Sequence, residues 1–418
     1  MRALPVLPLL LAASTWRGLE ARAAEDPEAD VPTVAGPIQG ETPAPPDEPP
    51  ASTARGERPY RIGGLVVPLA NFNSIDGLGL GLGLEVYDRK RELDYGYRNR
   101  LTAWTFWTTS GNYTSNYLQY ERRGEQLFVA RLAYRVWRNM VYVGVGGEDV
   151  SVQLPPERSF GNVVYGPSLL ASAIIPLPRN PVYVWAQAYG RYTLSEAAPG
   201  TLLEEESPFG LGEAFYFDTS VGLALQEVDR WPVPNKGIRS EVSGRFGGTV
   251  AAGDFTPIAG VNAEVIGWWP LVGQWLVLGG RVVFDKTWGQ RPWWEQEWLG
   301  GQFRDEAAYE QMLTGYARSR TRGDGVLANL LELRGWLGRT RHPFWDMDFY
   351  VDVYAESAFL FEGDDLGPHM PTLGASVQLV WQGVVQLRPF VSLGWLSDTP
   401  GGPRHATPFF GVSVVDPL

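Results

Sequence analysis

The chain of 418 residues contains no cysteine and only three histidines. Without cysteine there can be neither disulfide bonds nor thiolate metal sites. His342, His369 and His405 are widely spaced in loop-like settings, and no pair has the spacing of metal ligands. These positions also do not allow a Ser-His-acid site to be assembled. We therefore expect neither an enzyme nor a bound metal or other cofactor.

Long hydrophobic runs and positive charge are also scarce. Beyond the N-terminus no segment reaches the roughly 18 uninterrupted apolar residues of a membrane helix. There are 35 Lys and Arg against 47 Asp and Glu, and the net charge of −12 argues against nucleic-acid binding. In contrast, the 49 glycines and 13% aromatic residues are typical of a β-rich chain with many tight turns.

The first 59 residues differ from the rest. Arg2, an apolar stretch over 3–13 and the small-x-small run Ala21-Arg22-Ala23 predict an export signal over residues 1–24. Residues 25–59 are acidic and proline-rich and contain no aromatic residue. Such a composition cannot bury enough surface to fold, so we expect a disordered periplasmic leader.

From residue 60 to residue 418 the sequence predicts one strand after another. The sharpest case is "DMDFYVDVYAES", in which acidic residues and tyrosines share one face and Met347, Phe349, Val351 and Val353 share the other. A period of two with one polar face is the signature of a half-buried strand. The pattern gives roughly sixteen strands, and an antiparallel β-barrel is the simplest way to leave them without edges.

Alternation alone does not say which face meets water, but three features favour a membrane barrel over a soluble one. Charges of both signs recur on single faces, as a hydrated lumen allows. The barrel region is large for a soluble barrel. Tryptophans near expected strand ends also suggest a girdle at the membrane interface: Trp104, Trp107, Trp268, Trp269, Trp293 and Trp294.

The stretch that begins at Leu299 reads "LGGQFRDEAAYEQMLTGYARSRTRGDGVLANLLELR". It resembles the signature of the Omp85 superfamily, also called the surface antigen D15 or BamA/TamA family. It is similar to the loop that folds back into the lumen of those barrels and to the strand that follows. Weaker matches begin at Asp76 ("DGLGLGLGLEVYD"), Pro234 ("PNKGIRSEVSG") and Phe349 ("FYVDVYAESAFLF"), in the order of the family.

The resemblance implies that an arginine of the loop is held by carboxylates of the inner wall. Thr314 stands where the family has that arginine. Either this lock is lost, or another loop arginine supplies the charge, which we favour because the facing strand is unusually acidic; solvated loop charges are the alternative. The lock residues would be Gly315, Tyr316, Arg318, Arg320 and Arg322. Their acidic partners would be Glu332, Asp346, Asp348 and Asp352, and Glu356 extends this acidic stripe.

Two further departures concern the ends of the chain. The signal and leader occupy the place of the periplasmic POTRA domains that bind clients in the family, so we expect a barrel without POTRA domains. The last strand ends at Val415, before Asp416-Pro417-Leu418, and lacks the terminal aromatic residue of the family's assembly signal.

The resemblance implies an outer-membrane protein that aids insertion or translocation of proteins or lipids through a seam between the first and last strands. Its partners would be outer-membrane lipid or lipopolysaccharide and client outer-membrane or exported proteins, and not nucleic acid. A passive pore for small solutes and a structural or surface-interaction barrel remain as alternatives. The sequence does not identify clients or an oligomeric state.

Overall fold

The computed structural model describes residues 61–73, 77–89, 97–124, 126–138, 161–177, 181–229, 233–296, 323–342, 345–381, 385–397 and 402–415. All of them belong to one compact unit, Pro59–Leu418. The expected export signal and leader lie outside the described residues. In the described part of the chain, no helix is long and apolar enough to cross a membrane.

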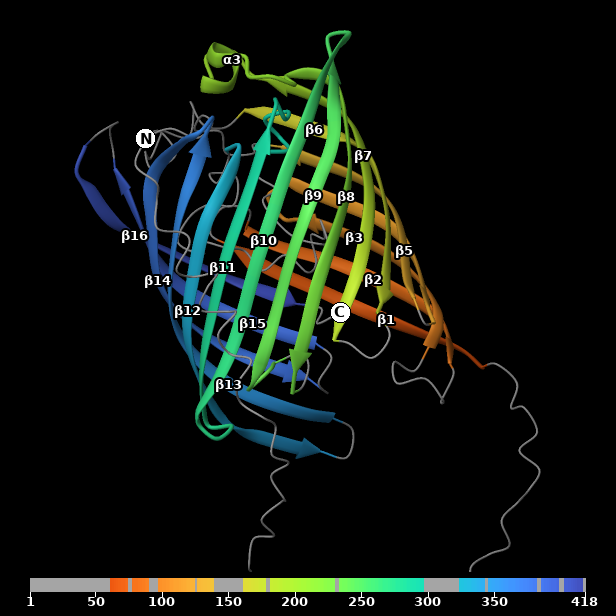
Figure 1. Ribbon diagram of the computed structural model, residues 1–418, viewed down its shortest axis with the longest axis vertical. Coiled ribbons are helices and arrows are strands. Elements are labelled where there is room, and N and C mark those ends of the chain that lie inside the picture. The colour runs from red at the N-terminus through yellow and green to blue at the C-terminus, as the bar shows by residue number, and fades with distance from the viewer. Residues whose placement is uncertain are drawn as a thin grey trace, which may run out of the picture. The chain divides into compact units, whose positions relative to one another are not determined.

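Sixteen antiparallel strands form one closed barrel in which each strand pairs with its sequence neighbours and β16 returns to β1. Figure 1 shows the green strands β8, β9 and β10 in front and the first strands, in orange, behind them. The first eight are β1 (Arg61–Asn73), β2 (Gly77–Arg89), β3 (Tyr97–Thr108), β4 (Tyr113–Arg123), β5 (Leu127–Arg138), β6 (Asn162–Pro176), β7 (Val182–Ala197) and β8 (Gly212–Val228). The others are β9 (Gly237–Ala251), β10 (Asp254–Val272), β11 (Leu276–Trp288), β12 (Gly325–His342), β13 (Trp345–Glu362), β14 (Asp365–Trp381), β15 (Val385–Ser397) and β16 (Arg404–Val415). A short helix, α3 (Leu202–Glu206), lies between β7 and β8. The predicted fold class and strand number are confirmed.

The barrel is apolar outside and polar inside. On β9, for example, Val242 and Phe246 point outward and are 55% and 68% exposed, whereas Glu241 and Arg245 point inward and are 5% and 6% exposed. A soluble barrel has the opposite polarity, because its apolar side chains fill the interior. This surface is therefore that of a membrane-spanning barrel.

β13 has the two faces that its sequence predicts. Tyr350, Asp352 and Tyr354 are buried on the inner face, while Val351 and Val353 are 39% and 55% exposed on the outer face. Register between antiparallel strands is fixed where one face must meet lipid, since a slip of one residue would turn every side chain to the wrong side.

The two ends of the barrel differ. The three longest connections, residues 139–161, 198–211 and 289–324, all leave from the end where the odd-numbered strands finish, which we call the loop end. The opposite end, the turn end, carries shorter connections. Long loops on one side and short turns on the other are the usual arrangement of outer-membrane barrels, with the loops extracellular.

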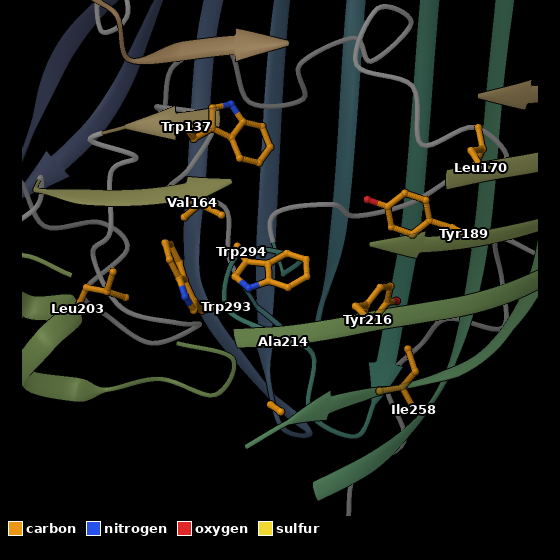
Figure 2. Close-up of a cluster of buried hydrophobic side chains, with 11 residues drawn as sticks. Trp137, Val164, Leu170, Tyr189, Leu203, Ala214, Tyr216, Ile258, Trp293 and Trp294 are labelled. Carbon is orange, nitrogen blue, oxygen red and sulfur yellow. The ribbon is translucent and has the colours of Figure 1, made fainter. Parts of the chain in front are cut away.

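The prediction of a tryptophan girdle is wrong for four of its six residues. Trp107 and Trp269 are 45% and 47% exposed on the outer face, as a girdle requires. Trp104 and Trp268 instead share the inner faces of β3 and β10, and Trp293 and Trp294 are fully buried, as Figure 2 shows for this last pair.

The loop-like setting expected for the histidines is also wrong. His342, His369 and His405 lie on β12, β14 and β16, and the His369 ring stacks on Phe359 with centroids 4.8 Å apart.

Candidate functional site: the inner wall, the tryptophan cap and the seam

A network of charged side chains covers the inner wall along β12 to β15. Asp352 on β13 is 1% exposed. Arg388 on β15 places Nη2 3.2 Å from Asp352 Oδ2 and 3.3 Å from Glu332 Oε2 on β12. Ser376 and Gln378 on β14 donate hydrogen bonds to the two oxygens of Asp352, Gln378 Nε2 at 2.8 Å. Asp352 is thus both neutralised and hydrogen-bonded, which a buried carboxylate requires.

Arg334 on β12 connects this wall to the turn end. Its Nη1 lies 3.6 Å from Glu332 Oε1, its Cζ lies 5.7 Å from the centroid of the Tyr350 ring, and its Nη2 donates to the backbone oxygen of Pro234. Pro234 belongs to the connection between β8 and β9. Val233 of the same connection is 4% exposed and packs with Tyr350. This connection therefore folds inward onto the β12–β14 wall and narrows the lumen at the turn end.

A second ion pair lies closer to the turn end of the same wall. Arg339 donates to both carboxylate oxygens of Asp348, from Nε at 2.8 Å and from Nη2 at 2.7 Å. The indole of Trp336 also donates to Asp348 Oδ1, at 3.3 Å. A register shift between Trp336 and Gly338 places Arg339 on the face that it shares with the carboxylate.

The structure brings three of the expected acidic partners together on one wall, namely Glu332, Asp348 and Asp352. Asp346 lies on the same strand and its backbone pairs with Arg341, but its side chain is outside the described residues. The expected lock residues of the loop also lie outside them: Gly315, Tyr316, Arg318, Arg320 and Arg322. The lock stays a prediction.

Sequence reasoning did not identify the arginines that hold these carboxylates within the described part of the chain. Arg388 had a signal, because it alternates with Gln386 and Ser392 on the polar face of its strand. Arg339 had none, since the register shift before it breaks the alternation of β12.

The long loop after β11 begins by folding into the barrel (Figure 2). Trp293 and Trp294 are 0% exposed and belong to a buried cluster with side chains from β5 to β10. The Trp293 backbone N–H donates to the Phe209 oxygen at 3.0 Å, and the Trp294 indole donates to the Gly210 oxygen at 3.3 Å. We call residues 289–296 the tryptophan cap. It joins the two long connections 198–211 and 289–324 inside the loop end.

An arginine of the wall anchors the tryptophan cap. Arg191 on β7 is 1% exposed, and its Cζ lies 5.1 Å from the Trp137 ring centroid and 4.6 Å from that of Trp294. Its Nη1 is 3.8 Å from Glu295 Oε2 of the cap. Arg291, also in the cap, donates to the Gly323 backbone oxygen at 2.7 Å and so draws the two ends of the long loop together.

The first and last strands meet over a very short length, which we call the seam. β1 and β16 pair only at Phe72–Val412 and Asn73–Gly411. By contrast, β1 pairs with β2 over all thirteen of its residues. Extending the seam register would set Val415, where β16 ends, opposite Leu69. Residues 61–68 of β1 therefore extend beyond β16, and no described strand pairs with that edge.

The strand beside the seam has a glycine-rich inner face. Leu80 and its neighbouring leucines of β2 point outward, so the alternating glycines point into the lumen. Rings from β3 cover two of them: a Cβ on Gly79 would lie 2.2 Å from Phe106 Cζ, and one on Gly83 would lie 2.6 Å from Trp104 Nε1. A side chain larger than glycine would therefore collide with these rings at either position.

No protein-family model matches the chain, and no curated protein matches it either. Among solved structures it is similar to BamA from Haemophilus ducreyi lacking POTRA domains 1–3, with 13% sequence identity and a TM-score of 0.53, over 85% of this chain and 70% of that chain. It is also similar to CdiB from Escherichia coli, with 14% identity and a TM-score of 0.52, over 87% of this chain. The chain spans 64% of the length of that CdiB.

At these identities the similarity shows the fold: the chain has the barrel architecture of BamA and CdiB, and the expected resemblance to Omp85 barrels holds at that level. The outer surface of large apolar side chains agrees with it. The protein is a bacterial outer-membrane barrel.

Proposed function

We propose that this barrel aids the insertion or translocation of proteins at the outer membrane by opening the seam between β1 and β16. The observation that carries the proposal is the two-residue pairing of these strands. Each backbone pair in a sheet contributes hydrogen bonds, and in lipid an unpaired strand edge is costly. Because the seam has so few pairs, it is the part of the wall that opens with the smallest loss of backbone hydrogen bonds.

The free length of β1 suggests how a client would be engaged. Residues 61–68 pair with β2 on one side and with no described strand on the other. An extended segment of a client can add to such an edge through main-chain hydrogen bonds, largely independently of its sequence. We infer that clients are outer-membrane or exported polypeptides that expose such a segment, and that lipid at the seam is the second partner.

The two inward-folding connections favour the seam over the lumen as the route. The tryptophan cap fills part of the loop end, and the connection with Val233 and Pro234 narrows the turn end. A passive pore for solutes needs a continuous water-filled path, which both features reduce.

Quantitative proteomics of the outer membrane after removal of this protein from its cell tests the proposal. The expected result is a defined set of barrels or exported proteins that falls while their transcripts hold steady. An outer membrane of unchanged composition would overturn the proposal. Conductance measurements on the purified barrel would then test the alternative of a passive pore, because a porin-type pore gives large and steady conductance steps.

A further inference from the structure

A buried carboxylate on the inner wall lacks a partner. Glu241 on β9 is 5% exposed, and neither of its side-chain oxygens has a hydrogen-bond partner. Leaving an ionised carboxylate buried without a partner is among the costliest arrangements in a protein. Its presence on a wall where other acidic side chains are paired points to a group that completes it.

A second carboxylate lies directly beside it. The strand register sets Glu241 opposite Glu264 on β10 and opposite Ala224 on β8. Glu264 is 7% exposed, and its Oε1 accepts a hydrogen bond from Arg281 Nε at 2.7 Å. Directly opposite residues have Cβ atoms about 5 Å apart, so two ionised carboxylates there repel each other, and a cation between them would relieve this repulsion. Arg281 is already held by Glu264, and Ala224 leaves room on the other side.

A third acceptor lies one step along the same face of β10. Asn262 is 2% exposed and its Nδ2 donates to the Phe284 backbone oxygen and to Asp285 Oδ2, both at 3.4 Å. These bonds turn its amide so that Oδ1 is the remaining atom, and Oδ1 has no hydrogen-bond partner. The wall thus presents three buried oxygens without donors: two on Glu241 and one on Asn262.

The other charged group of this region is Arg239, which precedes Glu241 by two residues on the same face. Among the residues described, the ion pairs of this region join Arg245 to Asp285 and Arg281 to Glu264, and none joins Arg239 to Glu241. Tyr183 on β7 pairs in register with Ala224 and adds an aromatic ring to the same row. The face of an aromatic ring also attracts cations, in addition to the attraction from the carboxylates.

We propose that Glu241, Glu264 and Asn262 form a binding site on the inner wall for one organic cation, an ammonium or guanidinium group. Such groups carry only N–H donors, which match acceptors that lack donors. A metal ion fits less well, because no group of three acidic or histidine side chains in the described part of the chain could hold one. The group belongs either to a free small amine or to a basic side chain of a polypeptide. The site does not depend on the proposed function.

Calorimetric titration of the purified full-length barrel in detergent micelles tests the site. The probes are agmatine, which carries both cationic groups, choline, which has no N–H donor, and a short lysine-containing peptide. The variant is Glu241→Gln, and the matched control is Glu121→Gln, which removes a lumen carboxylate already paired with Arg100 at 2.7 Å. Heat-dependent migration on gels checks that both variants fold.

Agmatine is expected to bind the native barrel, and its affinity is expected to fall at least about tenfold in Glu241→Gln and to change less than about twofold in Glu121→Gln. Choline is expected to bind weakly. If the peptide binds in place of agmatine and Glu241→Gln abolishes it, the source is a polypeptide side chain. Should Glu241→Gln not fold, Asn262→Val removes the third acceptor together with the Nδ2 donor, leaves both carboxylates in place, and is expected to weaken binding several-fold. The proposal is overturned if neither agmatine nor the peptide binds, or if the native barrel and Glu241→Gln bind the same probe with equal affinity.

Discussion

Arg388 on β15 and Asp352 on β13 face each other across β14, with Nη2 and Oδ2 3.2 Å apart, and this ion pair joins the strands on either side of β14. Asp352 has further hydrogen bonds from β14, and Arg388 also reaches Glu332 on β12. The pair therefore spans four strands through side chains alone. The network thus stabilises the C-terminal part of the wall, β12 to β15, whereas the glycine-rich hairpin of β1 and β2 lies at the N-terminal end of the sheet.

Replacing Asp352 by asparagine is expected to destabilise the folded barrel by about 1–3 kcal/mol, because Arg388 keeps Glu332 but loses its nearer carboxylate. Asp352→Lys is expected to cost more. Unfolding in urea, followed by the gel mobility of the folded form, measures the change. Asp365→Asn, at an exposed turn, is the control and is expected to lie within about 0.5 kcal/mol. Equal stability of Asp352→Asn and the native barrel would show that the network does not hold the wall.

Trp294→Ala is expected to release the tryptophan cap, because the indole is fully buried, stacks with Arg191 and donates to Gly210. Replacing a fully buried tryptophan by alanine lowers the free energy of unfolding by about 3–5 kcal/mol. In planar bilayers the variant is expected to give larger and longer conductance steps than the native barrel. Trp288→Ala, at a 49% exposed position next to the cap, is the control. Unchanged conductance in Trp294→Ala would mean that the cap does not restrict the lumen.

Two glycines of β9 are expected to respond oppositely to alanine. A Cβ on Gly247 would lie 2.0 Å from the Phe217 backbone oxygen, so β8 must shift, and a loss of about 2–3 kcal/mol is expected. A Cβ on Gly244 meets only the Phe246 ring, at 3.6 Å, so Gly244→Ala is expected to be neutral or slightly stabilising. Urea unfolding of the two variants decides, and a similar loss in both would contradict the register of β8 and β9.

The arginine lock of the long loop remains our proposal. If Arg318, Arg320 or Arg322 contacts the acidic wall, substituting all three with alanine is expected to expose the loop to added protease in intact cells. The same loop is expected to become exposed in Asp352→Lys. Arg404→Ala, at an exposed position near the start of β16, is the control. Protection that persists in the triple variant would show that these arginines are solvated loop charges.

Side-chain alternation was enough to predict the barrel and its strand number. The inward face of Asp348 and Asp352 followed only with the features that favour a membrane barrel and with the resemblance to Omp85 barrels. It could not predict the partners of these residues, because alternation defines a face and leaves the register between strands open. Trp293 and Trp294 were misassigned for a related reason. A pair of adjacent tryptophans has no period, so the sequence does not distinguish a membrane girdle from a cap that folds inward.

The short seam also had no signal in the sequence. The pairing of β1 with β16 depends on how the closed sheet staggers its ends. Only the register of Phe72 with Val412 shows that the last strand ends opposite the middle of the first.

Locking the seam with a disulfide tests the proposed function most directly. Phe72 and Val412 are register partners, so cysteines at both positions lie within disulfide reach, and the native chain has no cysteine to interfere. The control places cysteines at Val391 and Phe410 and so joins β15 to β16. These two strands already pair along their length. Outer-membrane proteomics of cells carrying each variant, before and after reduction, is the readout. Opening at the seam predicts that the oxidised seam variant loses the same proteins as cells without the barrel and regains them on reduction, while the control does not. A fully oxidised seam variant with an unchanged outer membrane would contradict it.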